Sequence, residues 1–238
     1  DSSTSRGLGD VYKRQDKISS IIFYGPPGTG KTTVARIMGN IFYSLGVLPS
    51  NRLLEVTRKD LVEGYVGQTA TKTARVVKRA VGGVFFIDEA YSLMGDNFGQ
   101  EATNTILPML LDYKGKMVCI AAGYPREIRQ WIDTNSGLES RFTKVIHFED
   151  YNPDELAQIF RMKAKKDKLT LTPEAENAMR VYFTDLYNRR ERNFANAREV
   201  NNYFDRVKKN QSSRLRHEME RPDFDPASYS ILLPEDMG

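Results

Sequence analysis

The stretch that decides the fold of this chain is Gly25-Pro26-Pro27-Gly28-Thr29-Gly30-Lys31-Thr32, which follows a short apolar run and precedes a helical pattern. Its glycines allow the backbone to curl so that successive N–H groups point inward at an anion. The positive N-terminal end of the following helix faces the same anion. In this pattern Lys31 places a charge near the β- and γ-phosphates, and the Thr32 hydroxyl is a ligand for magnesium (Mg²⁺). The spacing therefore predicts a site for a nucleoside triphosphate and its metal.

A second motif delivers two carboxylates directly after an apolar run: Val84-Phe85-Phe86-Ile87-Asp88-Glu89. The carboxyl ends of parallel strands form the sheet edge at which ligands bind. There we expect Asp88 to hold the magnesium, directly or through water, and Glu89 to orient and polarise the attacking water. This second carboxylate favours ATP hydrolysis over storage of the nucleotide. The alternative is a solvated acidic strand end without a chemical role.

Outward from these motifs the chain alternates short apolar strands with helical patterns. Strands are predicted over 21–24, 53–56, 84–87, 117–122 and 145–148, and helices over 31–45, 69–80, 100–113 and 127–133. Pro108 lies inside the third helix and should kink or split it. Because the strands are continuously apolar, they indicate an α/β fold with a parallel sheet covered on both faces.

After Tyr151 the strand signals stop and helical patterns follow one another. Pro153 and Thr172-Pro173 mark two helix starts, and a third helix is predicted over about 195–219. The sequence thus predicts an α/β nucleotide-binding domain over 16–150, then a small all-helical domain and C-terminal tail over 151–238. Residues 1–15 are polar and resemble translated adapter sequence. We expect them to be non-native, and we expect the chain, which lacks an initiator Met, to be a fragment.

The composition excludes several classes of protein. The 238 residues are 40% hydrophobic and 28% charged, as in globular proteins. The apolar runs fall short of the ~20 residues of a membrane-spanning helix, so no membrane partner is expected. The net charge of +4 is spread without a basic block, so nucleic acid is not an expected partner. The single cysteine, Cys119, permits no internal disulfide, which fits a reducing cytoplasm.

The first motif, combined with Asp-Glu rather than a lone Asp in the second, resembles the AAA+ ATPases. The resemblance narrows at Glu63-Gly64-Tyr65-Val66-Gly67-Gln68-Thr69, Phe86-Ile87-Asp88-Glu89-Ala90-Tyr91-Ser92-Leu93 and Ala122-Gly123-Tyr124. Together these stretches are similar to the CbxX/CfqX subfamily, which includes red-type Rubisco activase and stage V sporulation protein K. The match extends over about residues 16–220. It implies a P-loop NTPase (AAA+) domain with a helical lid, a homo-oligomer in the form of a hexameric ring, and ATP with Mg²⁺ as cofactors.

The resemblance also implies a nucleotide-binding set of residues. It comprises Gly25, Pro26, Pro27, Gly28, Thr29, Gly30, Lys31, Thr32, Thr33, Asp88 and Arg198. Of these, Arg198 matches the lid arginine known as sensor 2, which joins the lid to the phosphates. The alternative is an ordinary exposed arginine on a helix.

The resemblance gives a role to a further arginine. Arg141 matches the arginine finger, which enters a neighbouring subunit's site and, with Lys31 and Glu89, completes the catalytic set. The alternative for Arg141 is a local salt bridge with Glu139 or Glu149.

A loop between the second strand and the next helix, Tyr65-Val66-Gly67, matches the pore loop of such motors. A large aromatic side chain can press on an extended protein client without demanding a particular sequence. The alternative is an ordinary packed loop aromatic.

One position departs from the family pattern. Many AAA+ proteins end the fourth strand with a polar Asn or Thr, the sensor 1 residue, which helps to position water. Here the chain reads Ala122-Gly123-Tyr124, and Tyr124 is the candidate for that role.

The predicted function is a motor that couples ATP hydrolysis to remodelling or threading of a protein client through a ring pore. One alternative is a DNA-associated AAA+ ATPase, which would call for a basic groove or an added DNA-binding module. The other is a nucleotide-dependent switch or scaffold, against which Glu89 and Arg141 count. Rubisco, sporulation components and secretion substrates all remain open as clients.

Overall fold

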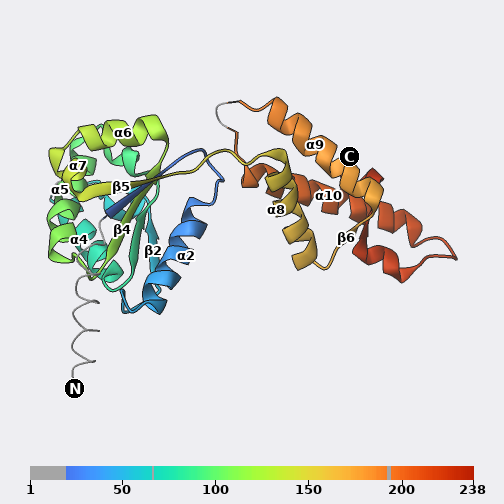
Figure 1. The fold of residues 1–238 in the computed structure, drawn as a ribbon, viewed down its shortest axis with the longest axis horizontal. Helices are drawn as coiled ribbons and strands as arrows, with labels where there is room; N and C mark the ends of the chain where they lie inside the picture. The colour runs from blue at the N-terminus through green and yellow to red at the C-terminus, as the bar shows by residue number, and fades with distance from the viewer. Residues whose placement is uncertain (1–19, 66, 192–193) are drawn as a thin grey trace, which may run out of the picture. The chain divides into compact units, whose positions relative to one another are not determined.

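A computed structural model describes residues 20–65, 67–191 and 194–238 (Figure 1). Two predictions fall outside this range: the adapter-like segment 1–15 and the side chain of Val66. The described chain divides into two compact units. The first unit contains residues 20–25 and Gly30–Phe148, and the second contains Pro26–Thr29 and Glu149–Gly238.

The first unit is built on a five-stranded parallel sheet with strand order β2-β3-β4-β1-β5. The strands are β1 (Ser20–Tyr24), β2 (Leu53–Val56), β3 (Val84–Ile87), β4 (Val118–Gly123) and β5 (Phe142–His147). Strands β3 and β4 lie inside the sheet, and every residue of both is buried. This burial on both faces is what their uninterrupted apolar sequences predict.

Helices cover both faces of this sheet (Figure 1). They are α2 (Lys31–Ser44), α3 (Arg58–Leu61), α4 (Thr69–Ala80), the 3-10 helix η1 (Ala90–Leu93), α5 (Asn97–Asp112), α6 (Pro125–Asp133) and α7 (Ser136–Arg141). Phe23 and Phe86 pack in one core cluster with Ala35 of α2. Alternate strand residues such as Ile22 and Phe85 pack on the opposite face, with side chains of α4 and α5.

The predicted fold class is confirmed, while several elements differ from prediction. Helix α5 is not split at Pro108 but runs continuously from Asn97 to Asp112. Its buried face, which includes Ile106 and Leu110, packs in the core on both sides of the proline, and this packing offsets the lost backbone hydrogen bond. The short helices α3 and α7 were not predicted, because one or two turns leave too few residues to show a helical period.

The second unit consists mainly of three helices, α8 (Pro153–Lys166), α9 (Pro173–Asn188) and α10 (Ala197–Glu218). Asn152 caps α8 in a reciprocal pair with Glu155, and the Thr172 hydroxyl caps α9. The core is aromatic: the Phe160 ring lies 5.2 Å from Phe204 and 5.5 Å from Tyr203 between ring centroids.

The C-terminal segment completes this helical unit in a way that the sequence did not predict. Two short strands, β6 (Thr170–Leu171) and β7 (Ile231–Leu232), pair in parallel and are followed by η3 (Pro234–Met237), while η2 (Pro226–Ser230) precedes β7. The Arg214 guanidinium binds both carboxylate oxygens of the buried Asp236, at 2.9 and 3.0 Å. The Tyr203 hydroxyl donates to the Met237 carbonyl oxygen (3.1 Å), so the segment is held by both side-chain and backbone contacts.

Within the described residues, none of the helices combines the length and the apolar character that a membrane span requires.

Candidate functional site

The phosphate loop connects β1 to α2 and has the backbone geometry of an anion cradle. Gly28 and Gly30 have φ values of 72° and 83°, in the left-handed region where a side chain is unfavourable. A Cβ atom added at Gly25 would collide with the carbonyl oxygen of Phe148, so a side chain is excluded there as well. The Lys31 ammonium donates to the Gly25 carbonyl oxygen (2.9 Å), which holds its charge at the start of the loop.

The tip of the loop, Pro26–Thr29, belongs to the second unit and is bonded there through its carbonyl groups. The Asn196 amide donates to the Pro27 carbonyl oxygen (3.2 Å), and the Ala197 N–H donates to that of Gly28 (3.1 Å). The Tyr151 hydroxyl donates to the carbonyl oxygen of Thr29 (2.9 Å). In a trans peptide the C=O and the following N–H point in opposite directions. These bonds therefore turn the following N–H groups the other way, as an anion-binding loop requires.

Oxygen atoms that could bind a magnesium ion come from two strands and a helix. The Thr32 hydroxyl, in the first turn of α2, donates to Glu55 Oε1 (3.3 Å), and Glu55 lies on β2. Asp88 follows β3, and its N–H donates to the Val56 carbonyl oxygen (2.8 Å), which fixes it beside the end of β2. Among the described residues, no group of three or more His, Cys, Asp and Glu side chains could hold a metal. This donor set fits magnesium, which keeps several water and phosphate ligands. Thr33 is exposed on α2.

Glu89 is held in an unusual backbone conformation directly after Asp88. It has φ 49° and ψ 45°, caps the N-terminus of η1 and is exposed. Its N–H donates to Asp88 Oδ1 (3.0 Å), so the first carboxylate fixes the backbone of the second. This arrangement presents a carboxylate at the carboxyl edge of the sheet, the position that a residue orienting water needs.

The predicted pore loop is exposed and anchored at both ends. Tyr65 has 73% of its surface accessible, the largest exposure among the exposed apolar and aromatic side chains. Glu63, which precedes the loop, forms an ion pair with Lys72 of α4 (3.1 Å). After it, the buried Thr69 hydroxyl accepts from the Glu63 N–H (3.0 Å). A Cβ at Gly67 (φ 82°) would meet open space, so Gly67 supplies a backbone conformation rather than room for a neighbour.

The two predicted arginines have different surroundings. Arg141, at the end of α7, donates to the Gly137 carbonyl oxygen (3.1 Å) and the Ser140 hydroxyl (2.7 Å). Among the described residues its guanidinium donates to oxygens of Leu107, Gly137 and Ser140, none of which is a carboxylate. Arg198 is exposed in the first turn of α10, and its backbone nitrogen would lie 3.2 Å from a Cβ built at Gly28.

Three residues that contact these motifs were not predicted to matter. Glu55 reaches Thr32 because the sheet order places β2 beside β3, which pattern alone does not reveal. Asn196 lies two positions before Arg198, the predicted sensor 2 arginine, yet no sequence signal pointed to its own contact with the loop. Tyr151 marked the start of the second unit, and its bond to Thr29 spans more than a hundred residues of sequence.

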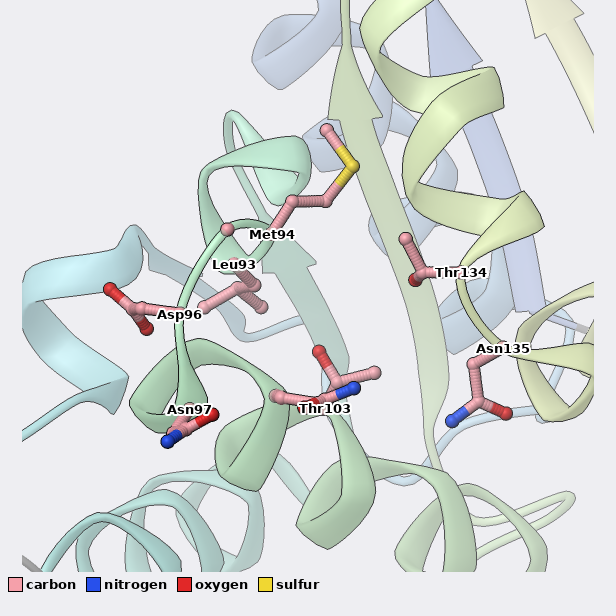
Figure 2. A pocket seen from close by; sticks show the side chains of 9 residues that line it. Leu93, Met94, Asp96, Asn97, Thr103, Thr134 and Asn135 are labelled. Carbon is pink, nitrogen blue, oxygen red and sulfur yellow. The ribbon is translucent and has the colours of Figure 1, made fainter.

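A pocket of about 280 Å³ lies apart from these motifs, between the N-terminal part of α5 and the junction of α6 with α7 (Figure 2). Its hydroxyl groups are engaged internally: Thr103 donates to the Gly99 carbonyl oxygen, and Thr134 donates to that of Trp131. Asn135 caps α7 through the Gly137 N–H. None of the predicted nucleotide-binding residues lines this pocket.

Family models match both units of the chain. The model described as the ATPase family associated with various cellular activities (AAA) matches residues 21–150. The model described as an AAA lid domain matches residues 152–238.

Curated relatives resemble the chain over most of its length. Protein CbbX of Cereibacter sphaeroides is 41% identical over 219 residues, covering 90% of this chain and 70% of the relative. The chloroplastic ribulose bisphosphate carboxylase/oxygenase activase of Cyanidioschyzon merolae is 43% identical over 81% of this chain and 67% of its own length. The ESX-1 secretion system protein EccA1 of Mycobacterium tuberculosis is 47% identical over 65% of this chain, which spans only 28% of that protein.

Solved structures share the fold at low identity. The FIGL-1 AAA domain has a TM-score of 0.65 at 17% identity, covering 99% of this chain and 78% of that one. A Thermotoga maritima RuvB mutant has a TM-score of 0.62 at 16% identity, covering 97% of this chain and 65% of the other.

Proposed function

We propose that this chain, which belongs to the AAA ATPase family and within it to the CbxX/CfqX type, hydrolyses ATP and couples hydrolysis to remodelling of a protein client. The observation that carries the proposal is the glycine cradle with Lys31 beside a strand edge that presents Asp88 and Glu89. We assign 16–150 to the nucleotide-binding domain and 151–238 to the lid and tail.

Each residue of the cradle has a task in hydrolysis. The loop N–H groups and Lys31 bind the phosphate oxygens, and Thr32 with Asp88 holds the metal. The metal, when bound, neutralises charge on the β- and γ-phosphates. Glu89 accepts a proton from the attacking water as the new phosphorus–oxygen bond forms and the bond to ADP breaks.

A ring of identical chains would complete the site. Arg141 is proposed to neutralise charge on the γ-phosphate of a neighbouring copy, an effect worth ~10³–10⁵ in rate in related phosphoryl transfer. Among the residues that the structure describes, its guanidinium donates to oxygens of its own unit, contacts that an incoming phosphate could replace. Arg198 is proposed to bind the phosphates from the lid.

The client is proposed to be a polypeptide gripped by Tyr65. The exposed ring on a braced loop supports this assignment, because a packed structural aromatic would be buried. One relative is named as an activase of ribulose bisphosphate carboxylase/oxygenase and another as a secretion system protein, and the client class here stays at protein. We propose a reducing compartment such as the cytoplasm, since Cys119 is buried and free.

The test is phosphate release from ATP and magnesium measured over a rising concentration of the chain. A ring motor with arginines acting between copies shows a specific activity that climbs steeply with assembly. Arg141→Ala should abolish that climb while a fluorescent ATP analogue still binds. Absence of phosphate release at every concentration, with tight nucleotide binding, would favour the switch or scaffold instead.

A further inference from the structure

The edge of the sheet beside Glu89 includes a glycine, Gly123, where strand β4 ends. Ile87, the last residue of β3, is paired with Ala121 of β4, so Gly123 at the end of β4 lies beside the segment that carries Asp88 and Glu89 after β3. The Gly123 carbonyl oxygen also accepts from the N–H of Gly25, the first residue of the phosphate loop (3.2 Å). Gly123 therefore lies between the two motifs but carries no side chain.

The space that a side chain at Gly123 would need is taken by Tyr91 and Ile128. A Cβ built at Gly123 would lie 2.7 Å from Cδ1 of Tyr91 and 2.7 Å from Cγ1 of Ile128. Tyr91 belongs to η1, the short helix that Glu89 begins. Its ring also lies 5.9 Å from that of Tyr124, between centroids. The ring of Tyr91 thus covers the end of β4, two residues after the carboxylate.

The phenol of Tyr91 keeps its proton in this position. Burial, and then the negative charge of Glu89, raise its pKa to about 12. A phenol can donate one hydrogen bond and accept another. At neutral pH Tyr91 therefore offers a neutral donor within the electrostatic reach of Glu89.

We propose that Tyr91 is a positioning residue for the attacking water, taking the place of the polar side chain that β4 lacks at Gly123. This inference rests on the proposed ATP hydrolysis. The phenol holds the water oxygen while Glu89 takes the proton, the new phosphorus–oxygen bond forms and the bond to ADP breaks. The phenol itself gains and loses no proton. Tyr124 remains in its neighbourhood as a packing partner.

The experiment compares Tyr91→Phe with Tyr113→Phe, a matched change at the C-terminal end of α5. Steady-state phosphate release and binding of a fluorescent ATP analogue are measured for both at a concentration that permits assembly. We expect Tyr91→Phe to lower kcat ~10–100-fold with the dissociation constant of the analogue changed less than twofold. Tyr113→Phe should keep both values. Hydrolysis by Tyr91→Phe at the wild-type rate, or a loss confined to Tyr124→Phe, overturns the inference.

A swap tests the shared space directly. Gly123→Asn combined with Tyr91→Ala and Ile128→Ala should hydrolyse ATP several-fold faster than the Tyr91→Ala, Ile128→Ala double variant, because the added amide occupies the vacated volume. A triple variant no faster than the double one contradicts the inference. If the wild-type chain and Tyr91→Phe hydrolyse ATP equally fast, the role of Tyr91 is wrong and the proposed function still holds. If the wild-type chain does not hydrolyse ATP at all, both the role of Tyr91 and the proposed function are wrong.

Discussion

Among the described residues, two that are not glycine have a positive φ immediately before a helix, one in each unit, and their surroundings are opposite. Glu89 (φ 49°, ψ 45°) starts η1 with an exposed side chain. Asn196 (φ 51°, ψ −118°) starts α10 and is completely buried. A positive φ thus accompanies an exposed side chain in the first unit and a buried side chain in the second.

The difference between them is how the backbone strain is offset. Glu89 lies in the small left-handed region that other residues visit at modest cost, whereas the ψ of Asn196 is one that glycine adopts far more readily. The Asn196 amide makes four hydrogen bonds: its oxygen accepts from the Tyr151 N–H, and its nitrogen donates to Pro27, Asp150 and Phe194. Such a conformation persists where the surroundings over-determine it.

The largest effect is expected for Glu89→Gln, which removes the charge of the exposed side chain and keeps its shape. We expect phosphate release to fall ~10²–10⁴-fold, because the amide cannot take the proton of water. Binding of a fluorescent ATP analogue should stay within a few-fold. Glu174→Gln, on the exposed start of α9, serves as the control. An unchanged hydrolysis rate in Glu89→Gln would show that the carboxylate is not the base.

The second change is made at the buried Asn196. Asn196→Ala removes four hydrogen bonds, leaves buried polar partners unsatisfied and keeps an unfavourable φ, so we expect a loss of about 2–4 kcal/mol in the free energy of unfolding. Asn196→Gly should lose less, because glycine accepts the backbone conformation. Urea unfolding followed by circular dichroism measures both. Equal losses for alanine and glycine would mean that strain contributes nothing at this position.

The third prediction concerns pH and the helical unit. Burial raises the pKa of Tyr203 to about 12 from its ordinary 10.0. Above pH 10 the unfolded chain loses this proton while the folded chain keeps it, so stability falls as the pH rises from 10 to 12. The contribution of Tyr203 is about 2–3 kcal/mol. In Tyr203→Phe the fall between pH 10 and pH 12 should be smaller by that amount, measured by chemical denaturation at each pH. An identical fall in both proteins would contradict the raised pKa of Tyr203.

The smallest expected effect is that of Glu89→Gly on stability. The side chain is exposed and glycine adopts its φ freely, so relief of strain and the greater entropy of the unfolded chain nearly cancel. We expect the free energy of unfolding to change by less than ~1 kcal/mol, well below the loss in Asn196→Gly. A larger loss in Glu89→Gly than in Asn196→Gly would reverse the comparison.

Much of the fold could be predicted from the sequence, because buried parallel strands such as β3 show as unbroken apolar runs. The continuity of α5 through Pro108 could not, since tertiary packing decides whether a proline splits a helix. The residues of the phosphate loop and the acidic pair after β3 could be named from their spacing, whereas Arg141, Arg198 and Tyr65 were named from the family resemblance, and all these roles stay predictions. The contacts of Asn196 and Glu55 were not predictable, because each joins segments that are far apart in sequence.

The bond between Arg214 and Asp236 has a practical consequence for recombinant work. Leu232, Asp236 and Met237 are all nearly inaccessible to solvent, so the last residues act as an interior part of the helical unit. A clone that stopped after α10 would expose the groove they fill and would remove Asp236 from the Arg214 guanidinium, which would keep Glu218 as a carboxylate partner. Purification handles are therefore better attached through a flexible spacer than exchanged for this segment.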